Sequence, residues 1–60
     1  MASRKVLTVG TVVVRWDSSS REYIARIPGN LAADYFTPDL DDAIGTARLM
    51  QRAVARQERV

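Results

Sequence analysis

The chain has 60 residues, enough for one domain spanning residues 1–60 and too few for two. It contains neither cysteine nor histidine, which excludes a disulfide and leaves only carboxylates for a metal site. The formal net charge is only +2, so the total charge does not by itself indicate nucleic-acid binding.

The small size of the chain has a consequence for its partners. A domain of this size buries only about 60% of the surface that its unfolded chain exposes. Such domains are usually stabilised by a disulfide, a metal or another chain. Because the residues for the first two are missing, we expect association with another chain, either as a homodimer or with an obligate partner.

The chain shows no sign of membrane insertion. No stretch approaches the roughly 20 apolar residues that span a bilayer. The N-terminal apolar run lacks the pattern of a signal peptide. The absence of cysteine fits a reducing compartment. We therefore expect a soluble cytoplasmic protein with no membrane partner.

The first half of the chain predicts strands. Residues 6–16 are rich in β-branched side chains and predict one long strand, with Gly10 marking a bulge or bend. In such a strand the even-numbered residues, from Val6 to Trp16, would share one face. Residues 17–20 predict a polar turn and residues 22–27 a second strand. After a turn at residues 28–30, residues 31–36 fit a short third strand better than an irregular return.

The second half predicts one long helix. Thr37 is a suitable N-cap, and Pro38 suits the first helical position. Acidic residues follow in the first turn, where the helix dipole favours them. Apolar residues recur at helical spacing and predict the sheet-facing side: Leu40, Ala43, Ile44, Ala47, Met50 and Val54. The expected fold is α+β, with a two- or three-stranded antiparallel sheet packed by one long C-terminal helix in the order β-β-β-α.

The residue inventory argues against catalysis. The usual general base, histidine, and the most reactive nucleophile, cysteine, are both missing. Asp41 and Asp42 are neighbours on a helix and point in different directions, so they do not form a carboxylate pair. The three glycines are scattered and form no phosphate-binding loop. We expect a protein that is not an enzyme and has no cofactor or metal.

An arginine stripe on the helix is the clearest functional feature. Arg48, Arg52 and Arg56 follow one another at i, i+4 and i+8, and Arg59 comes three residues later. Like charges at this spacing cost an isolated helix about 0.2–0.5 kcal/mol per pair. A negatively charged partner would offset that cost, although a solvated face that complements the helix dipole is the alternative. The predicted partner-binding residues are the four arginines with the outward-facing Leu49, and the predicted partner is the acidic surface of another protein.

A nucleic-acid partner is the second hypothesis. Arg15 and Arg26 would supply charge on the sheet, with Arg21 near a turn. Trp16 and Tyr23 could meet across the hairpin and stack on bases, or cover one end of a small core. Under this hypothesis the protein is a small nucleic-acid-binding domain that uses the basic sheet face or the helix.

Two short stretches resemble a known family. Residues 23–29 (YIARIPG) and 37–44 (TPDLDDAI) follow the order of an aromatic-led strand, a Pro/Gly turn and a helix that opens with acids. In this order residues 11–54 resemble the HicB antitoxins. The resemblance implies a small domain that binds and blocks a toxin ribonuclease and often self-associates.

Two further hypotheses follow from the overall layout. The three-strand-plus-helix order also resembles the N-terminal domains of phage integrases, which would place Arg15 and Arg26 against the DNA major groove. Tiny proteins without catalytic residues are also common among phage-encoded inhibitors of host defence, anti-CRISPR proteins among them. We therefore expect a non-catalytic protein-binding module that acts as a stoichiometric inhibitor.

Overall fold

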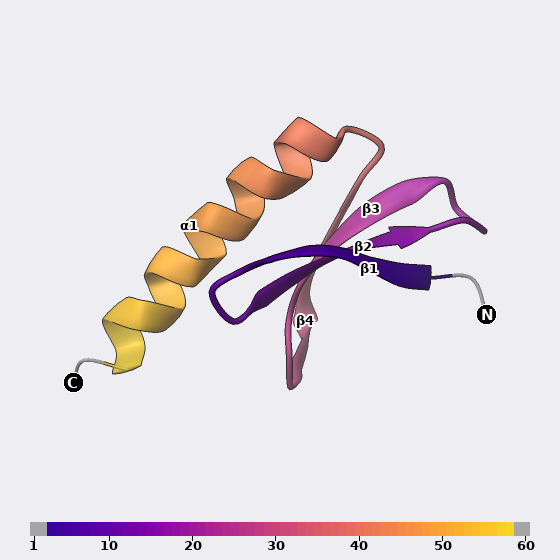
Figure 1. Ribbon diagram of the computed structural model, residues 1–60. Helices are drawn as coiled ribbons and strands as arrows, with labels where there is room; N and C mark the ends of the chain where they lie inside the picture. The colour runs from indigo at the N-terminus through magenta and orange to yellow at the C-terminus, as the bar shows by residue number, and fades with distance from the viewer. Residues whose placement is uncertain (1–2, 59–60) are drawn as a thin grey trace.

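The computed structural model describes the backbone of residues 3–58, and their side chains except those of residues 31, 57 and 58. Four antiparallel strands follow one another in chain order, and a C-terminal helix lies against one face of the sheet (Figure 1). The predicted α+β class is confirmed, but the sheet has four strands instead of two or three. The elements are β1 (Ser3–Val9), β2 (Val12–Asp17), β3 (Glu22–Ile27), β4 (Asn30–Thr37) and α1 (Leu40–Glu58).

The additional strand arises at Gly10 and Thr11, where the chain reverses in a two-residue turn. Val9 pairs with Val12 across this turn, and Gly10 has a φ of 61°. Glycine at positive φ in the first turn position is typical of a type II′ hairpin, whose twist matches that of the flanking strands. The prediction of one continuous strand over residues 6–16 is therefore wrong.

This reversal changes which residues of β1 face the helix. Leu7 pairs with Val14 and Val9 pairs with Val12, so in the part of β1 that follows the register shift the odd-numbered residues share a face with even-numbered residues of β2. A continuous strand would have put Val6 there instead. Leu7 and Val9 pack against the core, whereas Val6 stands at a register shift and is 40% exposed.

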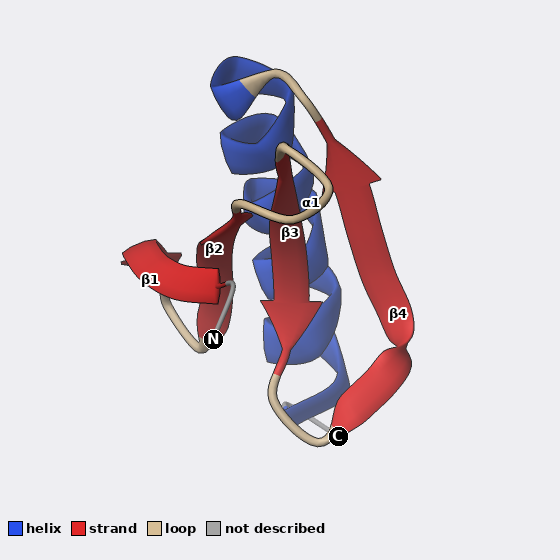
Figure 2. Cartoon of the chain, turned by 90° about the vertical axis from the view of Figure 1, so that its right-hand side faces the viewer, coloured by secondary structure: helices blue, strands red, loops and turns tan. Residues whose placement is uncertain are grey.

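The strand predicted at residues 31–36 is confirmed as β4, and its pairing with β3 is irregular. Ile27 pairs with Asn30 across a tight turn at Pro28 and Gly29, where Gly29 has a φ of 83°. Farther along, Ala25 pairs with Tyr35, so residue 26 lies opposite residues 31–34. Such a bulge bends a strand and protects a sheet edge against pairing with other chains. The bend is visible in the lower half of β4 in Figure 2.

The core lies between the sheet and α1. Alternation along β2 and β3 directs Val12, Val14 and Ala25 toward the helix, and all three are fully buried. Ala43 and Ala47 meet them from α1, and their small side chains let the helix approach the sheet closely. Further apolar side chains surround this cluster: Leu7, Val9, Tyr23, Ile27, Leu40 and Met50. The predicted inner face of the helix is therefore confirmed at Leu40, Ala43, Ala47 and Met50, and Ile44 and Val54 are half-buried.

The helix begins two residues later than predicted. Asp39 caps it, because its Oδ1 accepts a hydrogen bond from the Asp41 N–H at 3.0 Å and its carbonyl accepts one from the Ala43 N–H at 3.0 Å. Thr37 belongs to β4, and its buried hydroxyl accepts a hydrogen bond from the Asp39 N–H at 3.2 Å. Thr37 therefore orients the connection, while the more effective aspartate cap lies next to the first helical residue.

Candidate protein-binding surface

The outer side of α1 carries Arg48, Leu49, Arg52 and Arg56, which we call the arginine surface. All four side chains are exposed, and Leu49 is 63% exposed. They lie together because residues three and four apart are neighbours on a helix, and because Ala43 and Ala47 hold the opposite side against the sheet. The fifth predicted residue, Arg59, lies outside the described residues.

The guanidinium groups of the arginine surface have no partner among the residues that the structure describes. No hydrogen bond or ion pair joins Arg48, Arg52 or Arg56 to any described side chain. Their positive charges are instead aligned along one side of the helix. This surface can therefore offer planar, bidentate donors to carboxylates or phosphates without first breaking internal contacts.

A contact with the β1–β2 turn holds the helix in place. Gln51 Oε1 accepts hydrogen bonds from the backbone N–H and the hydroxyl of Thr11, each at 2.9 Å. Gly10 permits this contact, because a Cβ atom at that position would overlap the Gln51 side chain. The C-terminal part of α1 extends away from the sheet (Figure 1). The C-terminal turns that carry Arg52 and Arg56 are thereby placed at the periphery of the fold.

A second contact anchors the start of the helix. The Tyr35 hydroxyl donates a hydrogen bond to Asp42 Oδ2 at 2.7 Å, which joins the edge strand β4 to the first turns of α1. This hydrogen bond to a carboxylate raises the pKa of Tyr35 above its ordinary value. Our interpretation of the sequence missed both Gln51 and Tyr35. The polar Gln51 beside the predicted inner face was the only signal, and it did not reveal Thr11 as its partner.

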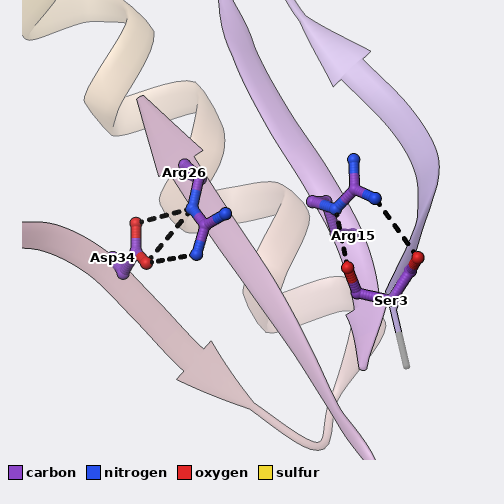
Figure 3. A network of polar contacts seen from close by, with 4 residues as sticks. All are labelled: Ser3, Arg15, Arg26 and Asp34. Carbon is purple, nitrogen blue, oxygen red and sulfur yellow. Dashed lines mark hydrogen bonds and ion pairs between the residues drawn. The ribbon is translucent and has the colours of Figure 1, made fainter. Parts of the chain in front are cut away.

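The arginines of the sheet are engaged within the protein. On the face opposite the helix, Arg26 donates three hydrogen bonds to Asp34 at 3.1, 3.1 and 2.7 Å (Figure 3). The hydrogen bonds to Asp34 raise the pKa of Arg26. Arg15 donates from Nε to Ser3 Oγ at 3.1 Å and from Nη2 to the Ser3 carbonyl at 3.3 Å. A phosphate that binds through Nε or Nη2 of either arginine would compete with these internal hydrogen bonds.

The residues predicted for a nucleic-acid site are spread over different faces. Trp16 and Tyr23 form a cross-strand pair with ring centroids 4.7 Å apart and an interplanar angle of 56°. Tyr23 packs against the core on the helix side of the sheet, opposite to the face of Arg15 and Arg26. Arg21 lies in the β2–β3 turn with a φ of 59°. The structure therefore does not bring the two aromatic residues and the arginines onto one surface.

The β2–β3 turn contains a local hydrogen-bonded motif. Asp17 Oδ1 accepts hydrogen bonds from the Ser19 N–H at 3.0 Å and from the Ser19 hydroxyl at 2.7 Å. Both hydrogen bonds lower the pKa of the Asp17 carboxyl, and the one from the Ser19 hydroxyl has the larger effect. This is an Asx turn, in which the aspartate replaces a backbone acceptor. The serine-rich stretch therefore has a structural role in closing the hairpin.

Neither a metal centre nor a membrane span is found in the described part of the chain. No three acidic side chains among residues 3–56 gather into a group that could hold a metal ion. The helix α1 is not apolar enough along its length to cross a bilayer. Comparison with protein-family models, curated proteins and solved structures found no match to this chain.

Proposed function

We propose that this protein is a non-catalytic binding module that inhibits another protein stoichiometrically. The arginine surface would dock on an acidic surface of that protein. The observation that carries the proposal is a set of guanidinium groups with no partner in the described part of the chain, gathered around Leu49, which is 63% exposed. Arginine is enriched at protein interfaces, where its planar head meets carboxylates and its stem packs on apolar groups.

The anchoring of α1 supports this proposal. The contacts of Gln51 with Thr11 and of Tyr35 with Asp42 fasten the helix near its middle and near its start. A helix held in this way presents its side chains without a large loss of backbone freedom on binding. Preorganisation of this kind favours affinity, since less entropy is lost when the complex forms.

A protein partner fits the observations better than a nucleic acid. Arg26 is engaged with Asp34 and Arg15 with Ser3, which leaves the sheet fewer guanidinium groups for phosphates. Tyr23 packs against the core and is not presented as a stacking platform. An exposed leucine within the arginine surface suits a contact that excludes water, as protein interfaces do.

The mode of action rests on composition and on the family resemblance. A chain without histidine or cysteine has few groups suited to turnover. The HicB-like order of strands, turn and helix suggests action by covering the functional surface of a partner. The cysteine-free composition also fits action in the cytoplasm.

The proposal is tested with two matched triple variants. The tagged chain would capture its partner from the native host, and the purified pair would then be titrated by calorimetry. Arg48→Gln, Arg52→Gln and Arg56→Gln together should weaken binding at least about tenfold, or 1.4 kcal/mol. Arg4→Gln, Lys5→Gln and Arg21→Gln remove the same charge elsewhere and should leave the affinity nearly unchanged.

Inhibition is tested separately from affinity. The activity of the partner should fall in proportion to added protein and reach its minimum at one equivalent. Equal binding by the two triple variants would refute a role for the arginine surface. Capture of nucleic acid alone, with an affinity that drops steeply with salt, would favour the second hypothesis instead.

A further inference from the structure

The outer side of α1 carries both signs of charge, at opposite ends. Asp41 lies in the first turn and Arg56 near the end, and both are exposed and unpaired among the described residues. At 1.5 Å per residue they are about 22 Å apart along the axis, and at about 100° per residue they differ by only about 60° around it. They therefore share a face but cannot reach each other within one chain.

We propose that a second copy of this chain pairs with this face, with the two α1 helices antiparallel. A two-fold axis near Arg48 and Leu49 places Asp41 of each copy opposite Arg56 of the other. The same axis places Gly45 opposite Arg52. Both charge pairs form at once, because a two-fold interface uses the same patch on both copies. The antiparallel arrangement also sets each helix dipole against the opposite pole of its partner.

Gly45 provides a second, independent observation. It is exposed in the interior of α1, and apart from its chain neighbours and the nearby helix backbone no atom lies within 4 Å of the position that its Cβ would occupy. Glycine is less favourable than alanine inside a helix, so packing within the chain does not explain this residue. In the antiparallel pair the missing side chain leaves room for Arg52 of the other copy. It also lets the two helix backbones approach.

The residues at the axis predict a weak dimer. The Leu49 side chains of the two copies contact each other, and this contact removes their exposed apolar surface from water. Arg48 of one copy also lies near Arg48 of the other, and this like-charge contact opposes association. A single face of a 19-residue helix is also small compared with stable interfaces, which bury about 1,200–2,000 Å². We therefore expect a dissociation constant of about 0.1–1 mM.

Self-pairing would cover the arginine surface that the proposed function assigns to another protein. The two states exclude each other, so an acidic partner has to displace the second copy. The inference itself does not depend on the proposed function, because self-association is measured with the purified chain alone.

Sedimentation equilibrium of the full chain tests the pairing. Asp41→Arg and Arg56→Asp should each weaken self-association about tenfold, because each change sets like charges against each other. An equimolar mixture of the two variants should associate more tightly than either alone, since each of its two contacts again joins opposite charges. A wild-type chain that stays monomeric at about 1 mM, or a mixture no tighter than its components, would overturn the proposal.

Cross-linking gives a second measurement that does not depend on charge. The chain has no cysteine, so one can be introduced alone. Leu49→Cys lies at the axis and should oxidise readily to a disulfide dimer. The control Arg56→Cys is also exposed but lies far from its own copy, so it should oxidise much more slowly. Equal rates for the two variants would contradict the proposed axis.

The variant Arg48→Gln separates this inference from the proposed function. It removes the like-charge contact and should tighten self-association about threefold, whereas it should weaken binding to an acidic partner. Weaker self-association in this variant would contradict the antiparallel pairing. Unchanged partner binding would count against the proposed function alone.

Discussion

Gln51 in the middle of α1 accepts two hydrogen bonds from Thr11 at the tip of the β1–β2 hairpin, each at 2.9 Å. The two partners are 40 positions apart in the sequence. Because the contact ties the helix to the far end of the hairpin, it sets the direction in which the arginine surface points. The candidate site is therefore positioned by the β1–β2 turn, which the residue pattern of the helix does not predict.

Replacing the acceptor should loosen this attachment. We expect Gln51→Ala to lower the free energy of unfolding by about 1 kcal/mol, because water can only partly replace the two lost hydrogen bonds. Urea denaturation followed by circular dichroism measures the change. Arg52→Ala, one residue away and exposed, should change the stability by less than about 0.5 kcal/mol. Similar losses in both variants would show that the attachment does not stabilise the fold.

Two glycines should respond in opposite directions to the same substitution. Gly10→Ala places a side chain at a φ of 61° and against Gln51, so it should cost about 1–3 kcal/mol. Gly45→Ala meets nothing within 4 Å and should add about 1 kcal/mol through helix propensity. In a Gln51→Ala background the Gly10→Ala loss should shrink to the backbone strain alone. Denaturation of the four variants tests this, and an unchanged loss would refute the contact.

The β2–β3 turn offers a site for stabilisation. Arg21 has a φ of 59°, a conformation that costs a residue with a side chain about 1–2 kcal/mol. We expect Arg21→Gly to raise the free energy of unfolding by about 0.5–1 kcal/mol, after the greater freedom of glycine in the unfolded chain is counted. Ser20→Gly, next to it but without positive φ, should give no gain. A shift in the thermal midpoint measures both, and equal responses would contradict this explanation.

On the sheet face opposite the helix, the ion pair of Arg26 with Asp34 should contribute more to stability than the contact of Arg15 with Ser3. The side chain of Asp34 is 12% exposed and that of Arg26 is 34% exposed. Asp34→Ala leaves a partly buried guanidinium without its partner and should cost about 1–2 kcal/mol, a value reduced because solvent reaches the arginine. Arg15→Ala loses only hydrogen bonds to a neutral serine and should cost less than about 1 kcal/mol. Urea denaturation of both variants compares them, and a larger loss for Arg15→Ala would be unexpected.

The contact between Tyr35 and Asp42 should make stability depend on alkaline pH. The hydrogen bond to Asp42 raises the pKa of Tyr35 in the folded chain above its ordinary value of 10.0. The phenol therefore contributes stability below pH 10.0, and this contribution disappears as pH rises through the folded pKa. The stability difference between wild type and Tyr35→Phe should be constant near neutral pH and vanish in strong alkali.

A spectroscopic titration of the tyrosines checks the cause. In Asp42→Asn the carboxylate is gone, and the pKa of Tyr35 should move back toward 10.0. Tyr23→Phe serves to assign the second tyrosine in the titration curve. A curve for Tyr35 that is the same with and without the Asp42 carboxylate would contradict the predicted pH dependence.

Much of the architecture could be predicted from local patterns. The apolar spacing of Leu40, Ala43 and Ala47 indicated the inner face of the helix, and Thr37 and Pro38 indicated its start to within two residues. The hairpin at Gly10 was missed because a Gly-Thr pair between β-branched runs fits both a bulge and a two-residue turn. Only the pairing of Val9 with Val12 distinguishes the two.

The sequence by itself determined the α+β class, the strand and helix tendencies, and the line of arginines on one side of a helix. These depend on spacing within single elements, where backbone geometry dictates which residues are neighbours. Only the tertiary structure decided which charges are available. It engages Arg26 with Asp34 and Arg15 with Ser3, and it gives Arg48, Arg52 and Arg56 no partner among the described side chains. The reason is that such partners come from different strands, and their distances depend on register and bulges that no single element encodes.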